Sequence, residues 1–453
     1  MNVVHYMIGL PPKRRGGAAI YALSLLQEQM KFRDTKVSIL IPGDSMCLGN
    51  KSKIKKCKSY LGVALYEISN PVLEPLMNGI KKASYIIGQF RKFDRNNLEK
   101  YYDEVKPDII HIHTLMGIPK ELLSFLKSKG VKIILTSHDY YGICPRVNLI
   151  DRFGRNCKDA SGKFCEDCNV YARSRLGLVI QNSNFFINVK GHIPQQLKKK
   201  FNPTLYKTSG NKVNLKPSDN DSFIKLHDYY QEIFKMVSAI HFNSFVAKQY
   251  FSRYLELPFN KVIPITNKFI HDNRKYKHIH NRVRIVFIGG LSPSKGFNVL
   301  RDALLRLNGQ GIINWTLSQW GEYKGEDKEC SRIKYCGKYS PDQLKSIYDN
   351  TDLLVVPSLW GETFSFVALE ALSYGVPVLM SDNVGAQLLL QSIAPSFVYH
   401  SNIELHNKLK WILEDPNCLS EYNNNIVLDS NINFSEKEHA KQIINFYHQV
   451  LSL

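Results

Sequence analysis

Short apolar runs alternate along this chain with stretches whose apolar positions recur every three or four residues. The runs Val3–Ile8, Val131–Thr136 and Leu353–Val356 are too brief for helices and rich in β-branched side chains, which is typical of buried strands. Between such runs, 19–26 and 297–307 carry apolar side chains at helical spacing. This alternation predicts an α/β fold with parallel, doubly wound sheets.

The length of the chain predicts more than one domain. A chain of 453 residues is too long for one ordinary hydrophobic core. Within the first domain we expect a cysteine-rich loop at 144–168 and a polar excursion, poor in apolar side chains, at 195–221. The expected parts are, in order, a first domain at 1–270, a basic and glycine-free linker at 271–282, a second domain at 283–432 and a terminal helix at 433–453.

Two glutamates, Glu362 and Glu370, lie in the stretch Thr351–Ser381, which the pattern predicts to be strand, loop, helix and strand. Ligands of open α/β sheets bind beyond the carboxyl ends of the strands, so the loop at 358–364 is expected to line a site. Amides at the start of the predicted helix suit an anion such as phosphate, and they belong to Thr363, Phe364, Ser365 and Phe366. Two solvated surface acids are the alternative interpretation of the glutamates.

The segment GETFSFVALEA, followed by GVPV, resembles the E-x7-E signature of the retaining GT-B glycosyltransferases, in particular family 4 (glycosyl transferases group 1). This resemblance is most specific over 284–385. It implies two Rossmann-like domains facing a cleft, with the helix at 433–453 crossing back to the first domain, and a reaction that needs no metal or other cofactor. The family's first glutamate faces the donor sugar and its phosphates, and the second holds the nucleotide ribose. The resemblance gives these roles to Glu362 and Glu370.

A lysine after the first strand of the second domain is a further candidate. Lys295 precedes Gly296, and a cation there would neutralise the charge that develops on a diphosphate leaving group. The family typically carries an arginine nearby, and this chain has Gly290 in that place. We expect either weaker donor binding or a substitute cation, for which the basic residues at 13–15 are candidates.

A glycine pair opens the first predicted helix. Gly16 and Gly17 let backbone approach a ligand closely, and they resemble the family loop whose glycines face the donor phosphates. A purely conformational role is the alternative, because many strand-to-helix turns carry glycine.

Histidines follow two of the predicted strands. His138 stands at a carboxyl end, on the ligand side of its domain, and the segment TSHD resembles the family position whose histidine contacts the transferred sugar. His113 occupies the corresponding end of the preceding strand and is a weaker candidate. For each of them a structural histidine is the alternative.

A cysteine cluster suggests a structural metal. The spacing C-x12-C-x7-C-x2-C can supply a tetrahedral zinc site, although it matches no familiar zinc module and thiols also cluster by chance. Four thiolate ligands would leave no open position for catalysis. The cysteines are Cys144, Cys157, Cys165 and Cys168.

The chain is strongly basic. It holds 60 Lys+Arg against 40 Asp+Glu, a formal charge of +20, and much of the excess is expected in loops such as 51–58. Such a surface favours acidic partners, and without a nucleic-acid-binding module we rank an anionic membrane surface above nucleic acid, with solvated charge as the alternative. No run of about 18 apolar residues is present, and Met1–Leu10 reads as a strand rather than a signal peptide. We expect a cytoplasmic protein, peripheral on the inner face of the membrane.

The resemblance implies a retaining, metal-independent hexosyltransferase. It would move a sugar from a nucleotide-diphosphate sugar to a hydroxyl of a saccharide, first of all a lipid-linked one, in bacterial surface-polysaccharide biosynthesis. Three alternatives stay open: a transferase with a soluble acceptor, a GT-B epimerase, and a non-catalytic nucleotide-sugar-binding or scaffold subunit. Gly290 favours the last of these, and Lys295, Glu362 and Glu370 oppose it.

Overall fold

The computed structural model describes residues 1–12, 14, 16–45, 51–87, 93–184, 186, 220–323 and 325–453. The polar excursion expected at 195–221 lies outside these residues except for its last two positions, which begin a helix. The chain forms two compact units, each described here by itself. The N-terminal unit comprises 1–243, 248–263 and 440–453, and the C-terminal unit comprises 244–247 and 264–439.

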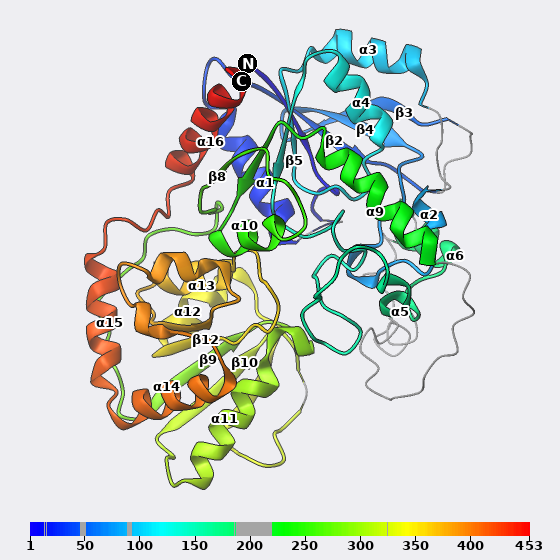
Figure 1. Cartoon of the computed structure of the whole chain (residues 1–453). Coiled ribbons are helices and arrows are strands. Elements are labelled where there is room, and N and C mark those ends of the chain that lie inside the picture. The colour runs from blue at the N-terminus through cyan, green and yellow to red at the C-terminus, as the bar shows by residue number, and fades with distance from the viewer. Residues whose placement is uncertain are drawn as a thin grey trace. The chain divides into compact units, whose positions relative to one another are not determined.

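The N-terminal unit is built on an eight-stranded sheet of order β3-β4-β2-β1-β5-β6-β7-β8 (Figure 1). All neighbouring strands are parallel except β3 and β4. The strands are β1 (Asn2–Tyr6), β2 (Lys36–Pro42), β3 (Lys53–Tyr60), β4 (Val63–Ser69), β5 (Ile109–Ile112), β6 (Lys132–Thr136), β7 (Ala239–Phe242) and β8 (Phe259–Val262). The helices are α1 (Gly17–Gln29), α2 (Ser84–Ile87), α3 (Arg95–Val105), α4 (Lys120–Ser128), α5 (Cys165–Asn169), α6 (Arg175–Asn182), α9 (Asn220–Phe234) and α10 (Phe245–Ser252).

The central strands of this sheet are buried on both faces. Every residue of β5 and β7 is buried, which fits a parallel sheet covered by helices on both sides. Helix α1 packs its apolar face, including Ala22, Leu23 and Leu26, against Met7 and Ile39. The predicted doubly wound α/β architecture is therefore confirmed.

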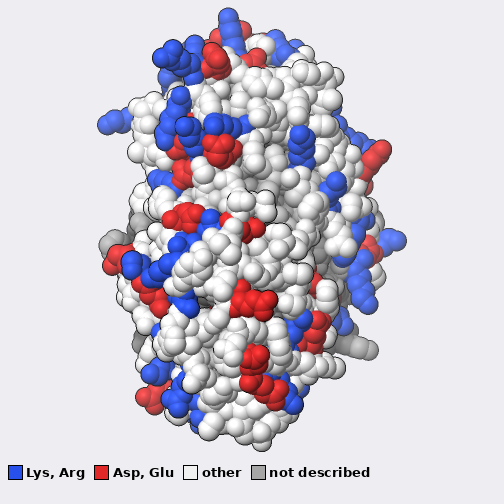
Figure 2. All heavy atoms as spheres, turned by 90° about the vertical axis from the view of Figure 1, so that its left-hand side faces the viewer, with Lys and Arg blue, Asp and Glu red and all other residues white. Residues whose placement is uncertain are grey.

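One charged segment was placed wrongly from the sequence. The lysines of 51–58 were expected in a loop, and most of them lie in β3, an antiparallel strand at the edge of the sheet. An edge strand tolerates lysines on its exposed positions, and they discourage pairing with another chain. On the face drawn in Figure 2, basic side chains are interspersed with acidic ones rather than forming one continuous basic area.

The C-terminal unit is built on a six-stranded, fully parallel sheet of order β11-β10-β9-β12-β13-β14. Helices α11 and α14 pack together on one face, and α12 and α13 lie on the other (Figure 1). The strands are β9 (Val283–Ile288), β10 (Trp315–Trp320), β11 (Ile333–Gly337), β12 (Leu353–Val356), β13 (Val378–Ser381) and β14 (Val398–Tyr399). The helices are α11 (Phe297–Gly309), α12 (Leu344–Asp349), α13 (Phe366–Ser373), α14 (Asn402–Glu414) and α15 (Asn417–Leu428).

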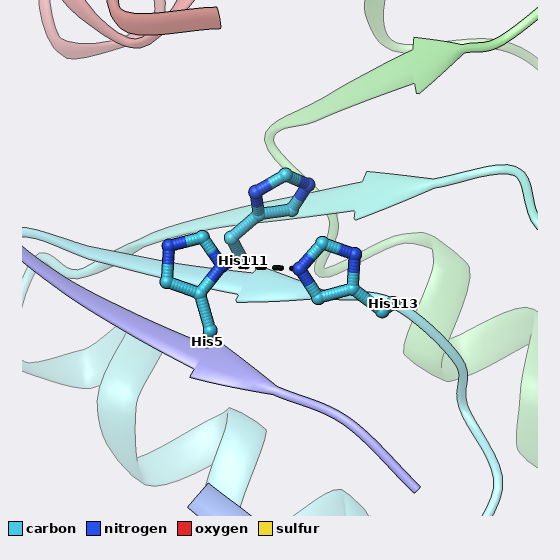
Figure 3. Close-up of side chains that lie close together, drawn as sticks. All are labelled: His5, His111 and His113. Carbon is cyan, nitrogen blue, oxygen red and sulfur yellow. Dashed lines mark hydrogen bonds between the residues drawn. The ribbon is translucent and has the colours of Figure 1, made fainter. Parts of the chain in front are cut away.

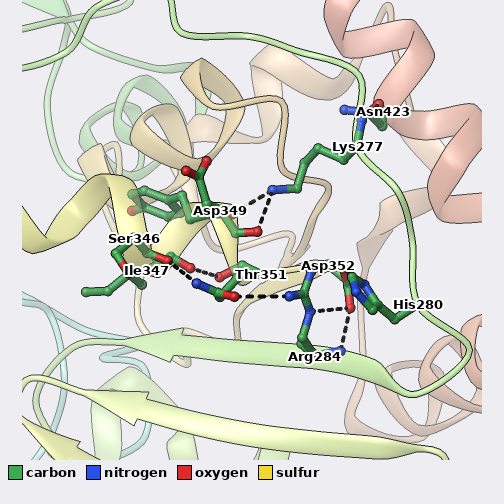
Figure 4. A network of polar contacts seen from close by, with 11 residues as sticks. Lys277, His280, Arg284, Ser346, Ile347, Asp349, Thr351, Asp352 and Asn423 are labelled. Atoms are coloured by element: carbon green, nitrogen blue, oxygen red, sulfur yellow. Dashed lines mark hydrogen bonds and ion pairs between the residues drawn. The ribbon is translucent and has the colours of Figure 1, made fainter.

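The segment expected as a linker, 271–282, forms hydrogen bonds with the rest of the C-terminal unit (Figure 4). The ammonium of Lys277 donates to the carbonyl of Tyr348 at 2.7 Å, and burial lowers the pKa of this lysine to about 8. Beside it, the fully buried Asp352 accepts from the guanidinium of Arg284 at 2.8 and 3.0 Å and from the Arg284 amide at 2.9 Å. The boundary between the units falls at 263/264 rather than at 270, because the chain at 264–270 packs with the C-terminal unit.

The last helix, α16 (Glu436–Leu451), belongs for most of its length to the N-terminal unit. It lies beside α1 (Figure 1). The hydroxyl of Tyr447 on α16 lies 3.2 Å from the amide nitrogen of Gln29 and 2.5 Å from Nδ1 of His111. Across the described ranges, no helix is both long enough and apolar enough to span a membrane.

Candidate functional site

A lysine and a glutamate pair beyond the carboxyl ends of β9 and β12. Lys295 ends a short 3₁₀ helix at 293–295, and its Nζ lies 2.9 Å from Oε1 of Glu362. The hydroxyl of Ser358 donates to the other carboxylate oxygen, Oε2. The lysine also lies over the indole ring of Trp360, 5.6 Å from its centre. The structure thus brings together two residues that the sequence assigned to one site.

Gly296 makes the approach of Lys295 to this loop possible. Its φ is +75°, and a Cβ built there would lie 1.7 Å from the carbonyl oxygen of Pro357 at the end of β12. Only glycine fits this close backbone crossing. The glycine next to the lysine therefore sets the position of the cation.

The start of α13 follows the Glu362 loop directly. Ser365 stands before the first helical residue with φ 115° and ψ 94°, outside the regions that serine normally adopts, and its side chain does not cap the helix. Thr363, Phe364 and Ser365 are buried, whereas Phe366 is half-buried. The first amides of a helix have no intrahelical acceptor, so this N-terminus suits an anion. Backbone strain of this kind concentrates at ligand sites.

Glu370 lies on the same helix, α13, and its carboxyl is almost entirely buried. Burial raises the pKa of its carboxyl from 4.5 to about 7, against the opposing effect of a hydrogen bond from the Tyr348 hydroxyl at 3.2 Å. The group therefore titrates near neutral pH. When ionised, it would be an acceptor for two hydroxyl groups.

Gly290, which stands where the family typically has an arginine, lies near the carboxylate of Glu322. A Cβ added at Gly290 would meet only the carboxylate of Glu322, at 3.4 Å, so a side chain fits there. The same carboxylate accepts from the Leu291 amide at 3.3 Å.

In the N-terminal unit, the glycine pair begins α1. Gly16 is the N-cap residue, both glycines are exposed, and a Cβ at Gly16 would meet nothing within 4 Å. Nothing in the packing around Gly16 therefore requires a glycine. Of the basic candidates beside them, Lys13 and Arg15 lie outside the described residues, and the guanidinium of Arg14 pairs with the buried Glu74 at 2.9 Å. That pairing weakens the case for Arg14 as the substitute cation.

A cavity of about 390 Å³ opens beyond the carboxyl ends of β1 and β2 in the same unit. Its lining mixes apolar surface with polar side chains, among them Arg14, Lys58, Tyr60, Glu74 and Asn182. Burial raises the pKa of the Glu74 carboxyl to about 7, and Arg14 opposes this shift. This cavity could not be predicted from the sequence, because its lining comes from separate parts of the chain.

His138 lies at the end of β6, with its Nε2 3.4 Å from Nδ1 of His113 and its ring against Tyr21, 4.8 Å between ring centres. Burial lowers the pKa of His138 to about 3 and that of His113 well below its usual value, so both imidazoles are neutral. Two further buried histidines, His5 and His111, lie beside His113 on β1 and β5 (Figure 3). These two were missed from the sequence, although the alternation I-H-I-H at 110–113 was visible.

The cysteines at 144, 157, 165 and 168 come close to one another without forming a metal-ligand geometry. Cys144 and Cys168 each help to raise the pKa of the Cys165 thiol, although burial is the largest cause. Within the described part of the chain, the one group of three or more His, Cys, Asp or Glu ligand atoms within 4.8 Å of one another is formed by His5, His111 and His113. The zinc hypothesis stays a prediction.

Two parallel-sheet α/β units of this kind define the GT-B class of fold. Solved structures share it over nearly the whole chain: sucrose-phosphate synthase from Thermosynechococcus elongatus, with 15% identity, a TM-score of 0.57 and 99% of each chain covered, and Anabaena HepE in complex with UDP and glucose, with 14% identity, a TM-score of 0.52 and 99% of each chain covered. Residues 269–427 match the family model "Glycosyl transferases group 1", and this range contains Lys295, Glu362 and Glu370.

Curated relatives match shorter stretches. An uncharacterised glycosyltransferase of Methanocaldococcus jannaschii is 25% identical over 175 residues, which are 36% of this chain and 44% of that protein. The lipopolysaccharide 1,2-N-acetylglucosaminetransferase of Salmonella typhimurium is 30% identical over 118 residues, which are 22% of this chain and 30% of that protein. The chain thus spans less than half the length of these relatives.

Proposed function

We propose that the protein is a retaining, metal-independent glycosyltransferase of family 4 that moves a hexose from a nucleotide-diphosphate sugar to a hydroxyl of a saccharide. The observation that carries the proposal is the convergence of Lys295, Glu362 and the start of α13 beyond the carboxyl ends of β9 and β12. A cation beside a helix N-terminus is an arrangement that favours diphosphate binding, and this supports the proposal. The match of residues 269–427 to the glycosyltransferase family supports it independently.

The residues divide the work as follows. Lys295 and the first amides of α13 stabilise the negative charge that develops on the leaving diphosphate. Glu370 holds the ribose hydroxyls of the nucleotide, and Glu362 and His138 position the sugar. The bond from the sugar C1 to the phosphate oxygen breaks while a bond to the acceptor oxygen forms on the same face, and the acceptor proton passes to the leaving phosphate. HepE was solved with UDP and glucose, so UDP-glucose is the first donor to test.

The proposed acceptor is a lipid-linked saccharide, bound in the N-terminal unit by the cavity beyond β1 and β2. A formal charge of +20 favours a protein that works at an anionic membrane surface, here the cytoplasmic face of the cell membrane. The lipopolysaccharide transferase among the relatives is consistent with a role in surface-polysaccharide biosynthesis.

A second candidate is a non-catalytic subunit that binds nucleotide sugars. The Glu322 carboxylate, 3.4 Å from where a Cβ at Gly290 would lie, favours it, because an acid rather than an arginine borders the expected diphosphate position. A transferase with a soluble acceptor and an epimerase differ from the first proposal in acceptor or product only.

The test is the release of nucleoside diphosphate from UDP-, GDP- and ADP-sugars, with and without lipid extract. We expect release from one donor, raised by the extract, and loss of release in Glu362→Gln. Glu414→Gln, which changes an exposed glutamate on α14, is the matched control and should behave as the unmodified protein. Nucleotide binding without release from any donor would favour the non-catalytic subunit, and unchanged release in Glu362→Gln would refute the site.

A further inference from the structure

A continuous chain of hydrogen bonds runs through the N-terminal unit and ends at His138. Every side chain before His138 is buried, and the chain crosses β7, β6, β5 and β1 as well as helices α1 and α16. Its members, in order, are the Ile263 carbonyl, His241, Thr136, His111, Tyr447, Gln29, His5, His113 and His138.

The Ile263 end of the hydrogen-bond chain fixes which partner donates in each bond. The carbonyl oxygen of Ile263 can only accept, so Nε2 of His241 carries the proton of this 2.8 Å bond. Burial lowers the pKa of His241 to about 4, so the ring is neutral and its Nδ1 accepts from the Thr136 hydroxyl at 3.0 Å. The Thr136 oxygen then accepts from Nε2 of His111 at 2.6 Å.

The donors and acceptors in the middle of the hydrogen-bond chain follow in the same order. Because His111 carries its proton on Nε2, its Nδ1 accepts from the Tyr447 hydroxyl at 2.5 Å. The oxygen of Tyr447 accepts from the Gln29 amide nitrogen at 3.2 Å, which turns the amide oxygen of Gln29 toward Nε2 of His5 at 2.8 Å. An amide has one donor end and one acceptor end, so Gln29 transmits the direction.

The last two hydrogen bonds show that His138 is a donor. Burial lowers the pKa of His5 to about 4, so the neutral His5 accepts at Nδ1 from Nε2 of His113 at 3.0 Å. His113 in turn accepts at Nδ1 from Nε2 of His138 at 3.4 Å. Each imidazole donates from Nε2 and accepts at Nδ1, and the reverse arrangement would require the Ile263 carbonyl to donate.

A metal at His5, His111 and His113 is the competing interpretation, because their ligand atoms lie within 4.8 Å of one another (Figure 3). However, both nitrogens of His5 and of His111 are already engaged in hydrogen bonds of 2.5–3.0 Å. A metal would break several of these bonds in a buried place, where unsatisfied polar groups are costly.

We propose that this hydrogen-bond chain is a positioning device that holds the His138 ring as the tautomer with its proton on Nε2 and so fixes the orientation in which the ring meets the transferred sugar. The tautomer follows from the bonds within the N-terminal unit alone. Only the role toward the sugar rests on the proposed function. Gln29, Tyr447 and Thr136 are then positioning residues that act on His138 through its neighbours.

Two substitutions of Gln29 separate this role from a purely structural one. Gln29→Met removes the acceptor of the His5 Nε2 proton and interrupts the hydrogen-bond chain between His138 and the Ile263 carbonyl. Gln29→Glu keeps an acceptor for His5, and in its protonated form also a donor for Tyr447, so the direction survives. Tyr66→Phe removes the hydroxyl of a buried tyrosine in the same unit, bonded to Glu104 at 3.0 Å and outside the hydrogen-bond chain, and serves as the control for the loss of a polar group.

The experiment records nitrogen chemical shifts of ¹⁵N-histidine in the full-length protein, with the His138 signals assigned by their loss in His138→Gln. We expect the proton on Nε2 in the unmodified protein, in Gln29→Glu and in Tyr66→Phe, and a mixture of tautomers in Gln29→Met. The transfer rate of Gln29→Met should fall with the population of the correct tautomer, about twofold for equal populations. A proton on Nδ1, or an unchanged single tautomer in Gln29→Met, would overturn the proposal.

Metal analysis of the same samples provides an independent measurement. One equivalent of bound metal that is lost in His5→Gln would overturn the hydrogen-bond chain in favour of a metal site, and its absence supports the chain. If no sugar donor is ever turned over but the tautomers behave as expected, the proposed function fails while the positioning of His138 stands.

Discussion

Replacing Glu370 by glutamine should remove a pH dependence from the stability of the C-terminal unit. Burial of the Glu370 carboxyl raises its pKa from 4.5 to about 7, and the hydrogen bond from Tyr348 offsets this only in part. The folded state therefore holds the proton more tightly than the unfolded chain does. Glutamine has nearly the same shape, still accepts a hydrogen bond and cannot ionise.

The sign and size of the effect follow from linkage. Between pH 4.5 and about 7 the folded state binds more protons than the unfolded state, so stability falls as the pH rises through this window and is level on either side. A pKa difference from 4.5 to about 7 corresponds to roughly 3 kcal/mol. Glu370→Gln should lack this loss, so its stability relative to the unmodified protein should rise by up to that amount between pH 4.5 and pH 8.

Urea unfolding followed by tryptophan fluorescence measures this change in the right place. The chain has 4 tryptophans, and Trp315, Trp320, Trp360 and Trp411 all lie in the C-terminal unit. Glu414→Gln, on an exposed position of α14, is the control and should follow the unmodified protein at every pH. Parallel pH profiles for Glu370→Gln and the unmodified protein would refute the raised pKa.

The same titration should appear in nucleoside binding. If Glu370 accepts the ribose hydroxyls as a carboxylate, uridine should bind about tenfold more tightly at pH 8 than at pH 6, because the ionised fraction changes by about that factor around a pKa of about 7. Uridine has no phosphate, so the titration of the ligand does not obscure the effect. Glu370→Gln should bind uridine with no such dependence.

Three further predictions concern other residues. Gly290→Arg should tighten UDP binding several-fold by calorimetry because a side chain fits there beside the diphosphate position, whereas Gly290→Gln should not. Asp352→Asn should destabilise the C-terminal unit by about 3 kcal/mol in the tryptophan assay, because it leaves the guanidinium of Arg284 without its buried carboxylate. If the cysteine cluster binds zinc, metal analysis should find one equivalent that a Cys165→Ser variant loses, and a metal-free, fully stable protein would contradict it; the expected ligands are Cys144, Cys157, Cys165 and Cys168.

The sheets could be predicted because their signal is local. Runs such as Leu353–Val356 are apolar over their whole length and end in β-branched valines, which is the pattern of a strand buried on both faces. Strand β3 failed this criterion because four of its eight residues are lysines, and an edge strand needs few buried side chains. Whether a strand could be predicted therefore depended on its place in the sheet, because a strand buried on both faces shows an apolar pattern and an edge strand need not.

The site was predicted in part because a family signature marks its residues one by one. The pairing of Lys295 with Glu362, which are 67 positions apart, follows only from the parallel register of β9 and β12. The same holds for His5, which reaches His111 and His113 only when β1 pairs with β5. An isolated histidine in an apolar strand carries no sign of its partners, so this chain of bonds could not be seen in the sequence.

The ion pair at the centre of the site leads to a test of its chemistry. Lys295 and Glu362 neutralise each other when no donor is bound, at 2.9 Å between Nζ and Oε1. An incoming diphosphate must compete with Glu362 for this ammonium and is also repelled by the carboxylate. Glu362→Gln removes both effects, so we expect UDP to bind as tightly as before or several-fold more tightly, while transfer of the sugar is lost. Lys295→Ala should weaken UDP binding in the same calorimetric assay. Weaker UDP binding in Glu362→Gln would show that the carboxylate holds the lysine in place for the diphosphate rather than competing with it.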